Sequence, residues 1–185
     1  MKIVVYGSFN CPYSFLASRR VDHLIERGLV DAQWRAVVHD RDVPPRGVPV
    51  SGELAEMFDR ELDQIRTLLR SDESFSVSRP SVQPNTTLAV AGYSAVPAND
   101  AHRLRRAIFG AFWLKDLDIG DADVLRELGC PTASSMTTME EWRDEWTDLG
   151  RPTVPMAVLP DGTVSRGLGV LTRLANLGAN QVAGA

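Results

Sequence analysis

The sequence predicts an α/β fold in which a βαβ unit and a ββα unit flank an all-helical insertion. Three patterns lead to this prediction. Residues 2–38 switch from strand to helix to strand character, residues 54–149 carry only helical spacing, and strand character returns at residues 156–166. This order of elements predicts a mixed sheet with helices on both of its faces and a helical cap.

The first unit begins with residues Lys2–Tyr6, whose β-branched and aromatic side chains are typical of a buried strand. The segment Gly7–Asn10 interrupts this strand. Apolar residues then recur at helical spacing from Pro12 onward, and Gly28 is a natural helix stop. Residues Gln33–Val38 predict the second strand.

The middle of the chain, residues 46–150, is expected to form the insertion, whereas residues 1–45 and 151–185 form the α/β domain. Proline and glycine between Asp40 and Pro49 mark a loop before it, and the polar segment Ser71–Pro84 reads as a connection. The apolar periodicity predicts helices over residues 54–69, 100–115 and 139–149. Two further helices are expected, one that begins after a cap at Asn85 or Thr86 and a short one from its cap at Asp121 through Leu128.

The closing unit contains two short apolar runs, Met156–Leu159 and Thr163–Arg166. They are joined across Pro160-Asp161-Gly162, and Asp-Gly between such runs predicts a hairpin. A last helix is expected from about Val170 to Leu177, and residues 178–185 are expected to fray.

Charge and hydropathy narrow the class of partner. The net charge is −4 and no basic patch dominates, which disfavours nucleic acid and anionic membranes. The N-terminal residues turn polar before an apolar stretch of signal-peptide length forms, and no apolar run is long enough to span a bilayer. We therefore expect a cytoplasmic protein, where a permanent disulfide between Cys11 and Cys130 is disfavoured. The histidines have no metal-ligand spacing with either cysteine, so no metal is expected.

Cys11 is the candidate nucleophile because it lies where the first strand gives way to the first helix. Pro12 suits the first helical position, so Cys11 is expected at the N-cap, facing free N–H groups and the positive end of the helix dipole. This environment predicts a lowered pKa for the Cys11 thiol, with Ser14 offering its hydroxyl to the thiolate. The alternative is an inert cysteine buried at a strand end.

A second feature is Val154-Pro155, directly before the third strand. A proline there can simply start the strand. It can also be a cis proline held in a functional loop.

Several segments, taken in order, resemble the DsbA-like branch of the thioredoxin superfamily, near the 2-hydroxychromene-2-carboxylate isomerases and kappa-class glutathione transferases. They are the active-site-like turn at residues 9–17, Pro84-Asn85-Thr86 with Ala89, the helical segment from Leu104 through Leu125, and Thr153-Val154-Pro155. The resemblance implies a thioredoxin-like fold with the helical insertion between the second and third strands.

The resemblance also implies that Cys11 faces Pro155 across a groove. There the backbone of Val154 would pair with an extended, sulfur-bearing partner. The residues expected to bind the substrate or its thiol are Phe9, Pro12, Tyr13, Asn85, Val154 and Pro155, with Cys11 and Ser14 as the catalytic pair.

The motif lies between two chemistries. Disulfide-exchanging members usually carry Cys-Pro-x-Cys, and Ser14 stands at the second cysteine here. Isomerase members usually begin the turn with Ser-Pro-Tyr-Ser, and Cys11 stands at that first serine. The first hypothesis is a monothiol oxidoreductase, in which the Cys11 thiolate forms a mixed disulfide that glutathione or another low-molecular-weight thiol resolves.

The second hypothesis is a glutathione-dependent isomerase or transferase, in which Cys11 or Ser14 orients the glutathione thiolate. The third is a binding module without turnover. We favour the first because a thiol stands at the nucleophile position. No tightly bound cofactor is expected. The expected partner is a small thiol or a thiol- or disulfide-bearing protein, and family analogy suggests a homodimer. Cys130 is either a loop or partly buried thiol without a role in the chemistry, or a distant resolving cysteine.

Overall fold

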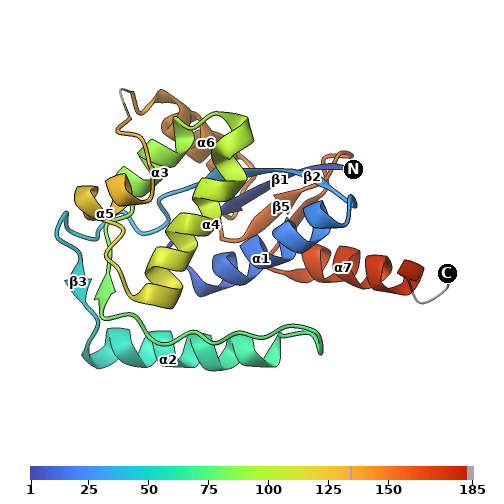
Figure 1. The fold of residues 1–185 in the computed structure, drawn as a ribbon, viewed down its shortest axis with the longest axis horizontal. Coiled ribbons are helices and arrows are strands. Elements are labelled where there is room, and N and C mark those ends of the chain that lie inside the picture. Colours follow the sequence, from blue (N-terminus) through green and yellow to red (C-terminus); the bar gives the residue numbers. More distant parts are fainter. Residues whose placement is uncertain (134, 183–185) are drawn as a thin grey trace.

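A four-stranded sheet lies at the centre of the molecule (Figure 1). The computed structural model describes residues 1–133 and 135–182. In sheet order β2-β1-β5-β6, the strands are β2 (Asp31–Ala36), β1 (Lys2–Gly7), β5 (Met156–Val158) and β6 (Val164–Arg166). β1 runs parallel to β2 and antiparallel to β5, and β5 runs antiparallel to β6. The hairpin predicted across Pro160-Asp161-Gly162 is therefore confirmed.

Two helices complete the α/β part. α1 (Pro12–Glu26) connects β1 to the parallel strand β2, and α7 (Gly169–Val182) follows β6. α1 and α7 pack against each other and lie side by side below the sheet in Figure 1. The predicted α/β class, with βαβ before ββα, is confirmed. The last helix is longer than expected and reaches Val182, while the remaining part of the segment expected to fray, residues 183–185, lies outside the described residues.

The alternation of side chains along β1 separates two cores. Ile3 and Val5 belong to the main hydrophobic cluster together with α1, whereas Tyr6 packs with Trp146 and Met156 in a smaller cluster on the other face. Both faces of this strand are therefore covered, which is why the strand reads as a continuous apolar run.

The insertion between β2 and β5 is mainly helical. Its helices are α2 (Gly52–Thr67), α3 (Thr87–Ser94), α4 (Ala98–Lys115), α5 (Ala122–Glu127) and α6 (Thr137–Asp148). The prediction of an all-helical insertion is wrong at one point, because β3 (Val48–Pro49) and β4 (Val82–Gln83) form an antiparallel pair. Each strand is two residues long and stands beside prolines, so its sequence resembles that of a loop.

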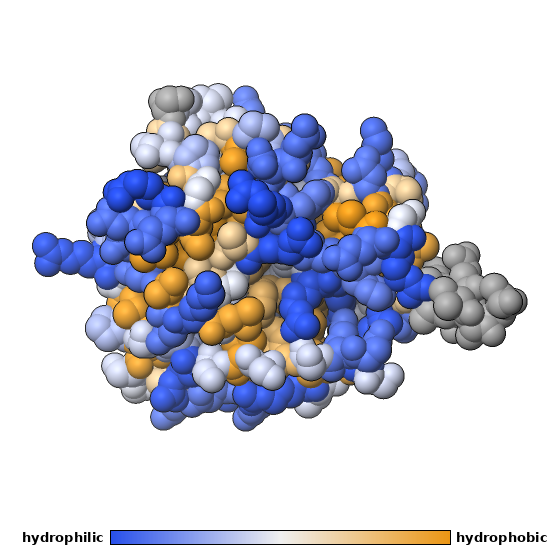
Figure 2. All heavy atoms as spheres, viewed as in Figure 1, coloured by the Kyte–Doolittle hydropathy of each residue, from blue (hydrophilic) through white to orange (hydrophobic). Residues whose placement is uncertain are grey.

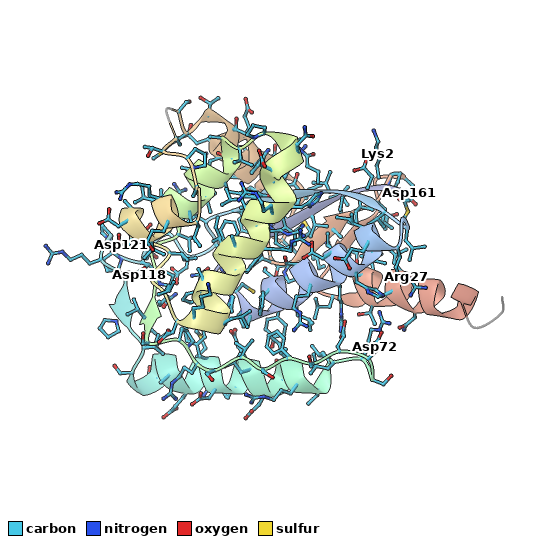
Figure 3. The ribbon with its side chains drawn as sticks, in the orientation of Figure 1. Lys2, Arg27, Asp72, Asp118, Asp121 and Asp161 are labelled. Atoms are coloured by element: carbon cyan, nitrogen blue, oxygen red, sulfur yellow. The ribbon has the colours of Figure 1, made fainter. Side chains whose placement is uncertain are left out.

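Side-chain caps and one close approach fix the α4–α5 corner. Asp121 accepts the N–H of Asp123 at 2.7 Å, as expected for the cap of α5, and Asp118 accepts the N–H of Gly120 at 2.8 Å. Figure 3 shows Asp118 and Asp121 together at this corner. A Cβ at Gly120 would meet the carbonyl oxygen of Asn85 at 2.9 Å, so the corner packs directly on the start of α3.

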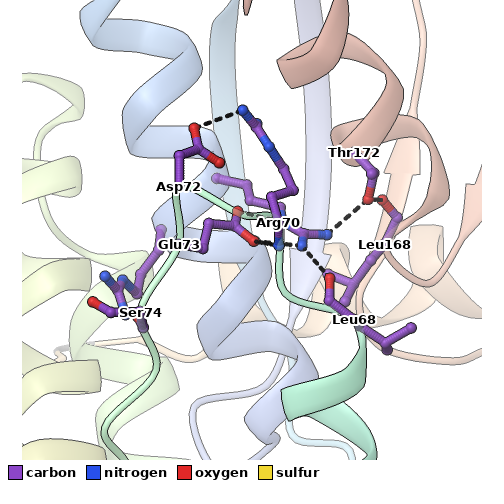
Figure 4. A network of polar contacts seen from close by, with 9 residues as sticks. Leu68, Arg70, Asp72, Glu73, Ser74, Leu168 and Thr172 are labelled. Atoms are coloured by element: carbon purple, nitrogen blue, oxygen red, sulfur yellow. Dashed lines mark hydrogen bonds and ion pairs between the residues drawn. The ribbon is translucent and has the colours of Figure 1, made fainter.

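Arg20, which is buried on α1, ties this helix to the end of α2 and to α7, and Figure 4 shows its partners Leu68, Glu73 and Thr172. Arg20 donates to the two carboxylate oxygens of Glu73 at 2.8 and 2.7 Å, to the Leu68 carbonyl at 2.8 Å and to the Thr172 hydroxyl at 2.7 Å. Although burial acts in the opposite direction, these contacts lower the pKa of Glu73 below its ordinary value. The network therefore links three helices that are distant in sequence.

Figure 2 shows apolar and hydrophilic side chains interspersed on the face that carries α4. A cavity of about 500 Å³ lies between α1 and α4, and neither cysteine lines it. Within the described residues, no helix is long and apolar enough to cross a membrane.

Candidate active site

Cys11 occupies the N-cap of α1, and Pro12 is the first helical residue, as the sequence predicts. The Cys11 N–H donates to the Ser8 carbonyl at 3.2 Å, and the Cys11 carbonyl accepts the N–H of Phe15 at 3.1 Å. These bonds fix the turn between β1 and α1. The residue as a whole is partly exposed, and it lies at the start of the helix.

The cis-proline loop lies directly opposite this sulfur. The Val154–Pro155 peptide bond is cis, and Sγ of Cys11 lies 3.8 Å from the carbonyl oxygen of Val154. The Trp146 indole donates to the Thr153 carbonyl at 2.9 Å, and the Gly167 N–H donates to the Pro155 carbonyl at 2.8 Å. The loop is therefore held from α6 and from β6, and the juxtaposition that the resemblance implied is present.

Ser14 lies fully buried beneath the turn, where its Oγ accepts the N–H of Ser8 at 3.2 Å. Burial is the largest influence on the pKa of the Cys11 thiol and raises it. The hydroxyl and N–H of Ser14 and the N–H of Tyr13 lower this pKa, whereas the Glu61 carboxylate raises it further. The net pKa lies above its ordinary value. The predicted lowering is therefore wrong, because desolvation and a nearby carboxylate outweigh the donors at the helix end.

A groove of about 480 Å³ opens beside Cys11. Its walls come from the start of α1, from α2, from the loop after β2 together with β4, and from the cis-proline loop. The sequence-predicted residues that line it are Cys11, Pro12, Tyr13 and Val154. Pro155 is buried behind Val154. The groove therefore joins the α/β part of the chain to the insertion.

The insertion supplies groove residues that sequence reasoning missed. They include Met57, Phe58 and Glu61 of α2 and Gln83 of β4. Met57 and Glu61 are four residues apart and share a helix face, which is the one signal in the sequence that connects them. Burial raises the pKa of Glu61, and burial and the Glu61 charge together raise the pKa of Tyr13. The Glu61 carboxylate therefore acts on both Cys11 and Tyr13 at the groove.

Two predicted binding residues do not reach the groove. Phe9 is fully buried, and its ring packs against Tyr93 and Phe109 with centroid distances of 5.6 and 5.0 Å. The expected contact of Phe9 with a partner thiol is wrong for this reason. Asn85 donates to the Val43 carbonyl and accepts the N–H of Thr87, so its amide ties a loop to the start of α3.

Cys130 belongs to the core rather than to the groove. Its sulfur packs against α3 so closely that a Cβ at Gly92 would lie 2.5 Å from it. Burial raises the pKa of its thiol to about 11. Both cysteines are free thiols, and Cys130 is not one of the described groove-lining residues. This geometry favours the structural interpretation of Cys130.

Comparison with known proteins identifies the family. The model of the DSBA-like thioredoxin domain matches residues 2–145. The chain belongs to this family. A relative in Bacillus subtilis (strain 168), the uncharacterized protein YwbO, is 27% identical over 146 residues, which cover 75% of this chain and 71% of the relative. The resemblance read from the sequence is therefore confirmed.

Solved structures of DsbA-like proteins share the fold over nearly the whole chain. The probable DsbA oxidoreductase SCO1869 from Streptomyces coelicolor has a TM-score of 0.70 at 15% identity, covering 97% of this chain and 90% of the other. A 2-hydroxychromene-2-carboxylate isomerase has a TM-score of 0.64 at 17% identity, covering 98% and 96%. The cytosolic disulfide reductase DsbM from Pseudomonas aeruginosa, determined with GSH, has a TM-score of 0.62 at 15% identity, covering 99% and 100%.

Proposed function

We propose that this DsbA-like protein is a monothiol thiol–disulfide oxidoreductase. The observation that carries the proposal is the placement of Cys11 Sγ at the N-terminus of α1, 3.8 Å from the Val154 carbonyl and on an open groove. The Cys11 thiolate attacks one sulfur of a disulfide, and the other half leaves as a thiolate that takes a proton from water. An external thiol, as thiolate, then attacks the mixed disulfide, frees Cys11 and leaves in a new disulfide.

The residues around Cys11 have separate roles in this reaction. The Ser14 hydroxyl and the N–H groups of Tyr13 and Ser14 stabilise the thiolate once it forms. Pro12 and Tyr13 bound the groove, and the backbone at Val154 receives the extended partner. Because Ser14 replaces a second cysteine, the resolving thiol comes from outside the motif. The Pseudomonas reductase determined with GSH supports the general class of low-molecular-weight thiols in this role, and the charges on the groove of this chain bear on which member of the class it accepts.

The raised pKa of Cys11 sets the pH dependence of the exchange. Burial keeps the resting thiol protonated at neutral pH, and the fraction of thiolate rises as the pH approaches the pKa. A thiolate of higher pKa is also intrinsically more nucleophilic. The rate of exchange should therefore keep rising above neutral pH.

Turnover of a small neutral disulfide in the presence of an external thiol tests the proposal. We expect a mixed disulfide on Cys11, located by peptide mass spectrometry, and loss of turnover in Cys11→Ser. Cys130→Ala should retain both the adduct and turnover, because its sulfur is a core atom. Equal turnover in Cys11→Ser and the unsubstituted protein would contradict the proposal.

One observation favours a second function, a glutathione-dependent isomerase. The raised pKa keeps Cys11 as a neutral S–H group, which can donate to a bound thiolate as the serine of the isomerase motif would. In that case Cys11→Ser should preserve glutathione-dependent isomerisation of an aromatic or unsaturated substrate while abolishing disulfide exchange. Disulfide exchange without such isomerisation in the unsubstituted protein would favour the oxidoreductase.

A further inference from the structure

The charges on the groove point to the kind of sulfur compound that it accepts. Two carboxylates line the groove, Asp40 after β2 and Glu61 on α2. Within the described part of the chain, none of the groove-lining residues is a lysine or an arginine, and His39 is the one histidine among them. The charged side chains that line the groove beside Cys11 are therefore carboxylates, which disfavour an anionic ligand there.

Both carboxylates are held in place. Asp40 accepts a hydrogen bond at 2.6 Å from the side-chain amide of Gln83, which is itself buried. Glu61 is half-buried on α2, and its charge is felt by the thiol of Cys11 and the phenol of Tyr13. A partly desolvated carboxylate is screened less by salt than an exposed one, so its effect on a neighbouring charge is larger.

Arg41, Arg143 and Arg166 lie outside the groove lining. Arg41 and Arg143 line a different hollow, against Met139 of α6, and Arg143 also pairs with Asp144. Arg166 donates to the carbonyls of Leu149 and Arg151. None of these guanidinium groups is among the described residues that line the groove.

We propose that the groove selects thiols and disulfides whose groups beside the sulfur are cationic or neutral, and disfavours anionic ones such as glutathione. The inference rests on the proposed disulfide exchange at Cys11 and names its substrate class. Glutathione carries two carboxylates and one ammonium, so its binding would place like charges beside Asp40 and Glu61. A small cationic or uncharged thiol avoids this repulsion and gains attraction when it is cationic.

Three small disulfides with the same two-carbon spacer between the sulfur and the end group test the charge selectivity. They are cystamine with ammonium ends, bis-hydroxyethyl disulfide with neutral ends and dithiodipropionate with carboxylate ends. The rate of adduct formation on Cys11 is measured by mass spectrometry. It is divided by the rate for a blocked, uncharged cysteine derivative under the same conditions. We expect cystamine to exceed dithiodipropionate by about tenfold at low ionic strength, and by much less at about 1 M salt.

Variants locate the origin of the selectivity. Glu61→Gln should reduce the ratio of the cystamine rate to the dithiodipropionate rate, and adding Asp40→Asn should bring it near unity. Glu61→Gln also lowers the pKa of Cys11 and speeds all three reactions, but a common factor cancels in the ratio. Glu56→Gln, on the same helix and outside the groove, is the matched control and should leave the ratio unchanged.

The outcomes separate this inference from the function on which it rests. Equal normalised rates for the three disulfides, a preference for dithiodipropionate, or a ratio unaffected by the double substitution would overturn the charge selectivity. If none of the disulfides modifies Cys11 while the blocked cysteine reacts, the oxidoreductase function itself is refuted.

Discussion

Ser14 has two roles at the residue scale, because it supports the turn as well as the sulfur. Its Oγ satisfies the buried N–H of Ser8, and its hydroxyl opposes the rise in the pKa of Cys11. The positions of Cys11 and Ser14 could be predicted from the sequence, because the end of a strand, a proline at the first helical position and a serine in the first turn are local signals. The direction of the pKa shift depends on burial and on Glu61, fifty residues away, and no local pattern contains either.

Ser14→Ala removes both contributions. We expect a loss of about 1–3 kcal/mol in the free energy of unfolding, because a buried N–H loses its partner. The pKa of Cys11 should rise further, since one donor to the thiolate is gone. Urea unfolding measures the first effect, and the pH dependence of alkylation with iodoacetamide measures the second. An unchanged alkylation profile would show that the hydroxyl does not act on the sulfur.

Glu61→Gln should shift the alkylation profile of Cys11 in the opposite direction. A carboxylate disfavours the thiolate, so its removal lowers the pKa of Cys11 and makes alkylation faster at any pH below that pKa. The rate of alkylation is measured by stopped flow over about pH 7–10, a range that includes the ordinary pKa of a thiol. Glu56→Gln should react like the unsubstituted protein.

At the scale of elements, the helices follow from apolar periodicity, whereas β3 and β4 do not. Periodicity needs several turns of helix or several residues of strand to be visible, and these strands are two residues each. Their pairing is a backbone interaction between segments separated by the whole of α2. Similarly, Arg20 lies within a well-predicted helix, but its partners lie on α7 and on the segment after α2, which the sequence of α1 cannot reveal.

Glu73→Gln should cost about 3 kcal/mol or more of unfolding free energy at neutral pH, because it leaves the buried Arg20 without its charged partner. The pKa of Glu73 is lowered in the folded protein, so its contribution is present above its unfolded pKa and is lost as the pH falls through the folded value. The difference between the two proteins should therefore shrink in acid.

Urea unfolding at neutral and at acidic pH measures both effects. Asp72→Asn is the matched control, since the Asp72 carboxylate that pairs with Arg70 is exposed and the pair should contribute less than about 1 kcal/mol. A difference that grows on acidification would contradict the assigned role of the pair.

At the scale of the molecule, one hydrophobic cluster runs through the α/β part and the insertion. Phe109 of α4 packs against Phe9 and Phe15 near the start of α1 and against Trp34 of β2. The division of the chain into an α/β domain (residues 1–45 and 151–185) and a helical insertion domain (residues 46–150) stays a prediction. A shared core means that neither part buries its apolar surface alone.

Phe109→Ala should therefore destabilise the whole protein by about 3–5 kcal/mol, since it opens a cavity where both parts meet. Because the core is continuous, unfolding should remain a single transition when followed by tryptophan fluorescence and by circular dichroism. Separate transitions for the two probes, in the unsubstituted protein, would show that the insertion folds independently.

The nucleophile comes from one part of the chain and a wall of its groove from another. Substitutions on α2 can consequently alter which molecules are accepted while the turn that carries the sulfur stays intact. Evolution can thus diversify recognition without rebuilding reactivity, and two homologues with the same Cys-Pro-Tyr-Ser turn need not share a substrate. Sorting such homologues by the residues at the Met57 and Glu61 positions should group them by ligand better than the four-residue turn does.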